Sequence, residues 1–217
     1  MSYISYYLFS YSIFIAAAIG LIRFKKLNKA YYPFIFLLWA GSANELISSV
    51  VQSRGGSSNL NNNIYVLAEA LLLVWQARNW KVFETNKWLF WVLEIGLLLS
   101  WLSEAMLSGG LSQLHSVFRI IAGTVILMIF IGFSNRLLFQ YAKPVAKDAA
   151  FLISIGLIFF FSFKILVEIY WWQGATSSVR YLEGLYLVVA CINLFVNLLY
   201  IIAVLWIPTK ARFTTFS

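Results

Sequence analysis

Seven apolar segments recur along the chain, and each is close to the length that crosses a lipid bilayer. Their approximate bounds are 4–22, 30–51, 62–78, 88–107, 114–138, 149–172 and 179–207. An α-helix needs about 20 apolar residues to span the hydrocarbon core, because it rises only ~1.5 Å per residue. The ~10-residue segments of alternating polarity that are typical of transmembrane β-strands are absent from the sequence. We therefore expect an all-α, polytopic membrane protein built as a seven-transmembrane-helix bundle.

The composition leaves little room for a separate soluble domain. Hydrophobic residues make up 62% of the chain and charged residues only 11%, whereas soluble domains carry about 25% charged residues. We therefore predict a single transmembrane domain over residues 1–217. The first span has basic residues after it (RFKK) rather than before it. This order is the reverse of a cleavable signal peptide, so we expect the first span to remain as an uncleaved helix.

The basic residues are distributed unequally between the two sides of the predicted bundle. The odd-numbered loops and the C-terminal tail carry twelve of them: Arg23, Lys25, Lys26, Lys29, Arg78, Lys81, Lys87, Arg136, Lys143, Lys147, Lys210 and Arg212. The opposite side has Arg54, Arg119 and Arg180. Because cytoplasmic loops are enriched in Lys and Arg, this asymmetry predicts an outside N-terminus and a cytoplasmic C-terminus. We expect a multi-pass protein of the bacterial inner (plasma) membrane.

The same distribution explains the net charge of +8. Short basic loops are typical of the cytoplasmic side of membrane proteins, so we exclude nucleic acid as a partner. Membrane lipids are the simplest partner of these loops, because anionic headgroups attract Lys and Arg near the surface. A partner membrane protein or cytoplasmic protein is an alternative.

A polar stripe runs along the second predicted span, between Trp39 and Gln52. At 100° per residue, one third of the helix circumference holds Gly41, Ser42, Glu45, Ser48, Ser49 and Gln52. A charged residue near the centre of a transmembrane helix costs about 2.5 to 3.5 kcal/mol on insertion scales. Glu45 is therefore expected to face protein or water. We place Glu45 and its neighbour Asn44 in a candidate binding site.

Most of the acidic residues lie at one predicted depth. Six of the eight fall in or at the ends of spans: Glu45, Glu69, Glu94, Glu104, Glu168 and Glu183. With the predicted orientation, all of these except Glu94 map to the outer half. Glu104 and Glu183 lie near the aqueous rim, where solvation alone can account for each. Clustering at one depth indicates compensation by partners or by water.

Basic and polar partners are available at a similar depth. Lys164 lies one turn before Glu168 in the sixth span, and His115 and Arg119 share a face of the fifth. The third and seventh spans carry long polar stripes, formed by Asn62, Tyr65, Glu69 and Gln76 and by Glu183, Tyr186, Asn193 and Asn197. The predicted site for an ion or small polar solute therefore comprises Asn44, Glu45, Tyr65, Glu69, His115, Arg119, Lys164, Glu168 and Glu183. A closed internal polar network is the alternative interpretation.

No motif for metal, cofactor or covalent chemistry stands out. The chain has one histidine and one cysteine, and it lacks a closely spaced pair of metal ligands. His115 has no serine or cysteine at a recognisable catalytic spacing, so we predict no catalytic residue. Glycine pairs such as Gly109-Gly110 are ordinary turns rather than a phosphate-binding loop. We expect no cofactor and no resident metal.

Two short matches suggest an internal repeat. Residues 68–74 (AEALLLV) resemble residues 182–188 (LEGLYLV), which would give two triple-helix bundles joined by the fourth helix, a 3+1+3 arrangement. The spacings differ, because Glu45 and Glu69 are 24 positions apart and Glu168 and Glu183 are 15 apart. Seven spans with an outside N-terminus resemble the small sugar-transporting SWEET proteins. Their Pro-Gln signature is missing here, so no residue role follows from this resemblance.

Three functions fit these patterns. Transport or conduction of a proton, cation or small polar solute is favoured by the long polar stripes. A ligand-sensing receptor or accessory membrane subunit, and a membrane-embedded enzyme acting on a lipid or small molecule, are the alternatives. A polar cavity continuous from Glu45 to Asn197 would favour transport. A closed outer pocket above a dry inner half would favour sensing, and a groove open to lipid beside His115 would favour catalysis.

Overall fold

The structure is a computed structural model, which describes residues 9, 11–140, 147–172 and 179–209; the side chains of residues 140, 171, 179–183, 185 and 186 are not described. In this part of the chain there are seven α-helices: α2 (Ile13–Arg23), α3 (Tyr32–Ser53), α4 (Asn59–Asn79), α5 (Lys87–Leu107), α6 (Ser116–Gln140), α7 (Ala149–Trp172) and α8 (Val179–Trp206). Two 3-10 turns, η1 (Phe24–Lys26) and η2 (Lys29–Tyr31), join α2 to α3. The described residues contain no β-strand.

The all-α expectation is confirmed, and the helix bounds agree with the predicted spans to within three residues from α3 to α8. α6 begins at Ser116, so His115 precedes the helix rather than lying within it. The described part of the first predicted span is α2, which has 11 residues. The rest of that span falls largely outside the described residues.

Five segments are long and apolar enough to cross a membrane: Lys29–Ser53, Lys87–Leu107, Ser116–Phe139, Ala149–Tyr170 and Leu187–Trp206. They make the chain a multi-pass membrane protein in length and composition. α4 has 21 residues but is not among the five, because asparagines, Glu69 and Gln76 interrupt its apolar sequence.

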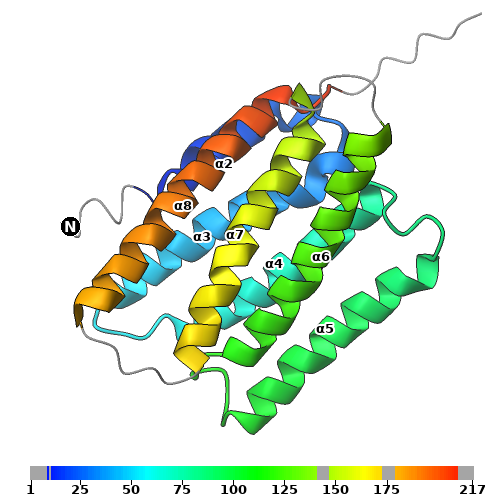
Figure 1. Ribbon diagram of the computed structural model, residues 1–217. Helices are drawn as coiled ribbons and strands as arrows, with labels where there is room; N and C mark the ends of the chain where they lie inside the picture. Colours follow the sequence, from blue (N-terminus) through cyan, green and yellow to red (C-terminus); the bar gives the residue numbers. More distant parts are fainter. Residues whose placement is uncertain (1–8, 10, 141–146, 173–178, 210–217) are drawn as a thin grey trace, which may run out of the picture.

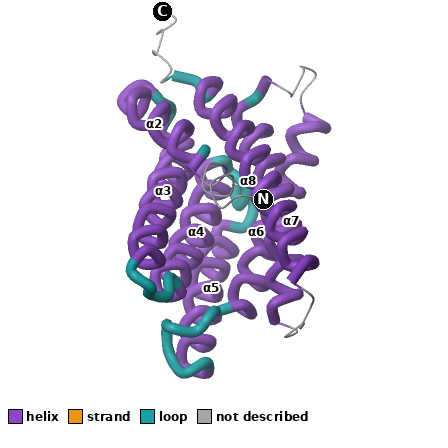
Figure 2. Tube along the Cα trace, turned by 90° about the vertical axis from the view of Figure 1, so that its left-hand side faces the viewer, coloured by secondary structure: helices purple, strands orange, loops and turns teal. Residues whose placement is uncertain are grey.

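Six helices form a closed ring. Each helix packs against the next in the order α2, α3, α4, α6, α7 and α8, and α8 returns to α2. α5 lies outside this ring, where it packs against α4 and α6 (Figure 1). The view turned by 90° shows the same helices running roughly side by side (Figure 2).

α4 is the most polar helix of the ring, and its polar residues face other helices. Asn63, Glu69 and Gln76 are all buried, between 0% and 3% exposed. Polar groups within a membrane are tolerated where they face the interior of a bundle and find partners there. The position of α4 against α3, α5 and α6 supplies that enclosure.

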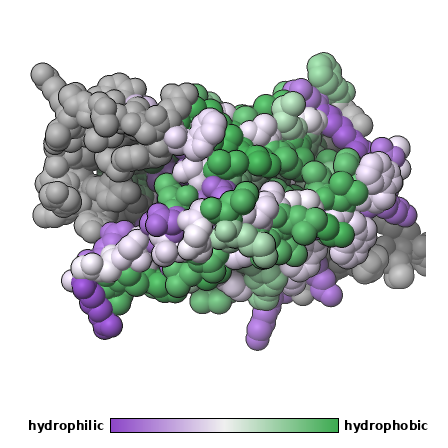
Figure 3. All heavy atoms as spheres, turned by 90° about the horizontal axis from the view of Figure 1, so that it is seen from below, coloured by the Kyte–Doolittle hydropathy of each residue, from purple (hydrophilic) through white to green (hydrophobic). Residues whose placement is uncertain are grey.

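The outward faces of the helices are apolar. Large side chains such as Met106, Leu107 and Phe139 are 81% to 90% exposed. On α5, Phe90 and Leu97 are the buried residues. Figure 3 shows many hydrophobic residues on the end of the molecule seen from below, with strongly hydrophilic residues projecting at the edges. Exposed apolar surface on this scale is unfavourable in water and suits contact with lipid.

The start of α3 is fastened to α4 by Gln76. Pro33 lies in the first turn of α3, a position where the missing N–H of proline costs nothing. The backbone N–H of Phe34 donates to Gln76 Oε1 at 2.9 Å, and Gln76 Nε2 donates to the carbonyl of Ala30 at 2.7 Å. One fully buried amide therefore satisfies backbone groups at a helix start that lies within protein.

The end of α2 is joined to the end of α8 beside this point. The Arg23 guanidinium donates to the carbonyls of Val204, Leu205 and Ile207 at the C-terminal end of α8. These carbonyls have no partner within their helix, and a cation stabilises the negative end of the helix dipole. The backbone N–H of Asn28 also donates to the carbonyl of Pro208 at 3.0 Å. These contacts close the ring between α2 and α8.

We predict that Gln76→Leu destabilises the protein. The substitution keeps the volume but leaves the Phe34 N–H and the Ala30 carbonyl buried without this partner, which should lower the free energy of unfolding by roughly 2 to 4 kcal/mol. Thermal unfolding of the purified protein in detergent measures this effect. Gln113→Leu is the control, because Gln113 is exposed; equal unfolding temperatures for the two variants would contradict the role of Gln76.

Candidate functional site

A cavity of about 120 Å³ lies inside the ring. Residues of α2, α3, α4, α7 and α8 contribute to its wall. The polar ones are Asn44, Glu45, Tyr65, Glu69, Asn193, Asn197 and Tyr200, and the apolar ones include Ile13, Leu37, Leu157 and Phe160. The polar stripes predicted on the second, third and seventh spans therefore meet in one place. Glu45 and Asn197, the two residues at the ends of the predicted polar path, line the same cavity.

Glu69 is held by two partners from different helices. Lys164 Nζ of α7 lies 2.5 Å from Glu69 Oε2, and the Tyr65 hydroxyl, one turn before Glu69 on α4, donates to Glu69 Oε1 at 3.2 Å. The Lys164 ammonium also lies 5.0 Å from the Phe160 ring centre, within the range of a cation–π contact. The side chain of Glu69 is 5% exposed, so its charge requires this compensation.

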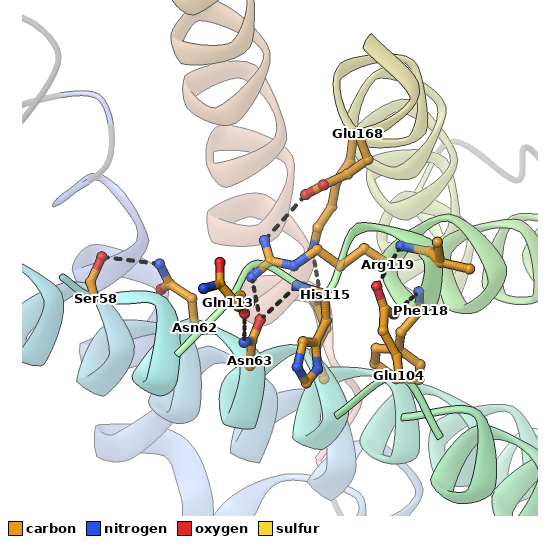
Figure 4. Close-up of polar contacts among 12 residues, drawn as sticks. Ser58, Asn62, Asn63, Glu104, Gln113, His115, Phe118, Arg119 and Glu168 are labelled. Carbon is orange, nitrogen blue, oxygen red and sulfur yellow. Dashed lines mark hydrogen bonds and ion pairs between the residues drawn. The ribbon is translucent and has the colours of Figure 1, made fainter. Parts of the chain in front are cut away.

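Glu168 forms the second buried ion pair. Arg119 Nη1 of α6 lies 3.2 Å from Glu168 Oε1, and the two side chains are 10% and 9% exposed. Arg119 Nη2 also donates to Asn63 Oδ1 of α4 at 3.2 Å. Figure 4 shows the Arg119 guanidinium between Glu168 and Asn63. Arg119, which belongs to α6, thus connects that helix to both α4 and α7.

The two ion pairs are adjacent because of helix geometry. Lys164 and Glu168 are four residues apart on α7 and lie on one face of it. Each pairs across the bundle with a different helix, Lys164 with Glu69 of α4 and Glu168 with Arg119 of α6. The two ion pairs therefore connect α7 to α4 and to α6.

The N-terminus of α6 is capped by side chains from α4 and α5. Glu104 of α5 accepts from the backbone N–H groups of Val117 and Phe118, and Asn63 Oδ1 accepts from the N–H of His115. Carboxylates are favoured at this position, because the first N–H groups of a helix have no partner within it. Glu104 therefore has a structural role.

His115 is 1% exposed and packs edge-on against Trp101, with ring centres 5.9 Å apart. Its Nε2 lies 3.5 Å from the carbonyl of Gly110. Within the described part of the chain, His115 Nδ1, Arg119 Nε and Glu168 Oε2 are buried atoms without a hydrogen-bond partner. Buried polar atoms of this kind usually have a partner, which can be an ordered water.

Glu45 differs from Glu69 and Glu168. It is half-buried, and the described residues provide it with no ion pair or hydrogen bond, whereas Glu69 and Glu168 are each paired with a cation. Its neighbour Asn44 accepts from Asn61 Nδ2 at 2.7 Å. The described wall of the cavity therefore has one carboxylate whose charge is not neutralised by a neighbouring residue.

The predicted site residues are distributed over three places. Asn44, Glu45, Tyr65 and Glu69 line the central cavity, with Lys164 bound to Glu69. Arg119, Glu168 and His115 lie around Asn63. Glu183 belongs to α8, but its side chain lies outside the described residues, as does that of Arg180.

Some site residues were not singled out in the sequence. Asn63 binds His115, Arg119 and the α5–α6 loop, through the carbonyls of Leu111 and Gln113. It lies off the stripe formed by Asn62, Tyr65, Glu69 and Gln76, so a search along one helix face misses it. The sequence did contain one indication of such a residue, because Arg119 within a predicted span requires a polar partner. Tyr200, at the end of the seventh span's stripe, also lines the cavity.

Comparison of the chain with protein-family models, with curated proteins and with solved structures gave no match. A half-buried carboxylate together with amides and two tyrosine hydroxyls can bind a cation or an amine, because all of these groups provide oxygen acceptors.

We predict that Lys164→Met destabilises the protein strongly. It leaves the Glu69 carboxylate buried without its cation, a change that costs about 3 to 5 kcal/mol in other buried pairs. Adding Glu69→Gln should recover much of this loss, because no buried charge then remains. Thermal unfolding in detergent measures both variants.

The control is the exposed pair Lys81–Glu84, whose nitrogen and oxygen lie 3.4 Å apart. Lys81→Met should change stability by less than about 1 kcal/mol, as is usual for surface pairs. A double variant as unstable as Lys164→Met alone would contradict the interpretation.

Proposed function

We propose that this protein is a seven-span transporter or channel for a small cation or cationic solute, and that the central cavity is its binding site. The observation that carries the proposal is the unpaired carboxylate of Glu45 in a cavity inside a helix ring, beside the other polar residues of its wall. An ionisable residue at such a position marks an ion or solute pathway more often than a structural contact.

The membrane topology is part of the same proposal. α2 and the residues before it would together form the first span. α4 would cross the membrane while its polar residues face the neighbouring helices. The described basic residues Arg23, Lys25, Lys26, Lys29, Arg78, Lys81, Lys87, Arg136 and Lys147 fall in or next to the segments that join α2 to α3, α4 to α5 and α6 to α7. The positive-inside rule assigns those segments to the cytoplasm. The bacterial inner membrane, the single domain and the 3+1+3 repeat stay predictions.

The cavity volume limits the solute. A cavity of about 120 Å³ holds several water molecules and is smaller than the ~150 Å³ cavity that binds one benzene in another protein. A proton carried by ordered water, a partly hydrated metal cation or a small alkylammonium ion fits this space. Sugars and drug-sized ligands need pockets of roughly 300 Å³ or more.

Transport requires access from both sides, and this conformation is closed on one of them. Towards the start of α3, the bundle interior is filled by Phe34, Leu73, Val74, Ala203 and Val204, each at most 1% exposed. The Tyr200 ring, which lines the cavity, packs edge-on against Phe34 at 5.1 Å. In the proposed mechanism the Phe34–Tyr200 contact opens to release the cation inward, as in alternating access.

The same closed half supports a second candidate function. A receptor or accessory subunit would bind a ligand at Glu45 and change its helix packing without passing the ligand through, and a dry inner half suits such a protein. Its basic loops would then contact a partner protein or anionic lipid. The enzyme alternative has less support, because His115 packs against Trp101 at the helix cap and has no nucleophile among its described contacts.

The test is cation and proton flux in proteoliposomes that contain the purified protein. We expect flux under an imposed gradient, and Glu45→Gln should reduce it by about 10-fold or more, since interactions with a charged group are worth ~1.5 to 3 kcal/mol. Glu84→Gln, an exposed loop substitution, should leave the flux unchanged. A folded wild-type protein without flux of any cation would contradict transport and favour the receptor.

We also predict that Gly41→Val blocks the cavity. A Cβ at Gly41 would lie 2.9 Å from Ile13 Cδ1 and 3.3 Å from the Tyr65 hydroxyl, both at the cavity wall. Overpacking of this kind costs about 1 to 3 kcal/mol, so the variant should fold but lose flux or cation binding. Gly96→Val on α5 is the matched control, because a Cβ there meets nothing within 4 Å. Unchanged flux in Gly41→Val would place the pathway elsewhere.

A further inference from the structure

A second site lies outside the ring, independent of the central cavity. We propose that the groove between α4 and α5 binds a phospholipid with a primary-amine headgroup, of the phosphatidylethanolamine class. Arg78 would bind its phosphate, Glu94 its ammonium group, and the apolar wall an acyl chain. The proposal does not depend on the transport function.

The groove has a volume of about 670 Å³. Its wall is formed by Ala68, Leu71, Leu72, Trp75, Phe90 and Trp91, together with two charged residues, Arg78 and Glu94. α5 packs only at the edge of the ring, and its outward residues Trp88, Trp91 and Ile95 are more than half exposed. An apolar groove at the outer face of a membrane-spanning bundle is in contact with lipid chains.

Arg78 is positioned by aromatic rings. Its guanidinium carbon lies 4.3 Å from the centre of the Phe90 ring and 5.6 Å from that of Trp91. These distances are within the range of cation–π contacts, which orient the planar guanidinium. Arg78 is exposed, and no carboxylate of the described residues lies within 4.0 Å of it. Its N–H groups are therefore available to a phosphate, which guanidinium groups bind in a bidentate manner.

Glu94 provides the opposite charge. It lies one turn beyond Phe90 on α5 and is half-buried in the groove wall. Its carboxylate and the Arg78 guanidinium line the same groove without forming an ion pair within 4.0 Å. A ligand can therefore lie between them, and a carboxylate within a membrane-spanning segment indicates a binding partner.

The two charges select the headgroup. A ligand with one anionic and one cationic group complements both residues, and its apolar tail complements the wall. A primary ammonium donates N–H hydrogen bonds to a carboxylate, whereas the trimethylammonium of phosphatidylcholine has no N–H donor. Phosphatidylglycerol has no cation for Glu94. Arg78 is in the last turn of α4 and Trp88 in the first turn of α5, and arginine and tryptophan are typical of the interface where phosphates lie.

The test is native mass spectrometry of the full-length protein released from detergent after titration with phosphatidylethanolamine, phosphatidylcholine and phosphatidylglycerol of identical acyl chains. We expect phosphatidylethanolamine to bind most tightly. Glu94→Gln should reduce its affinity to that of phosphatidylcholine, a loss of about tenfold that corresponds to ~1.4 kcal/mol. Arg78→Gln should weaken all three lipids.

Lys87→Gln and Glu84→Gln are the controls, because both residues are exposed near the same end of α5 but do not line the groove. Equal affinities for the three lipids, or an unchanged selectivity in Glu94→Gln, would overturn the proposal. A dimer that excludes added lipid and dissociates in Arg78→Gln would also overturn it, since a second copy would then occupy the groove.

Discussion

The cost of placing a charge in a medium of low dielectric constant organises this protein. In a bilayer, no water is available to compensate a carboxylate, so a charged residue must be enclosed with a partner. The polar groups of α4 are arranged in this way. Glu69 is paired with Lys164 of α7, and Asn63 is bound to Arg119, which in turn is paired with Glu168. The ring of helices is the enclosure, and the ion pairs define which helices must be neighbours.

Among the described carboxylates inside the ring, Glu45 is the exception. The cations that neutralise Glu69 and Glu168 are supplied by α7 and α6, but the described residues supply none to Glu45 on α3. Buried ion pairs are weak evidence for stability, because desolvation cancels much of the attraction. A carboxylate left half-buried and unpaired at a cavity is therefore more informative about function than either of the two pairs.

The sequence predicted the helices well, because apolar runs of about 20 residues determine both their type and their bounds. It also predicted polar stripes on the second, third and seventh spans, because helical periodicity relates residues on a single helix, and residues of all three stripes line the central cavity. It did not determine which helices meet. The four-residue spacing of Lys164 and Glu168 places them on one helix face. In the structure, however, each of them binds a residue 49 or more positions away. Partners such as Asn63 depend on tertiary packing, which periodicity does not encode.

The polarity of α4 also bears on how the chain enters a membrane. A segment with Asn61, Asn62 and Asn63 in its first turns gains little free energy when it moves from water into the membrane by itself. Sufficient length does not compensate for the lack of apolar surface. Its polar groups find partners on α3: Asn61 donates to Asn44 and Ser48, and Gln76 binds the start of that helix. In the proposed seven-span topology, α3 and α4 would insert as a hairpin, with α3 providing the hydrophobicity and the hydrogen bonds that α4 lacks. Biogenesis of the bundle would then proceed by helix pairs rather than one span at a time.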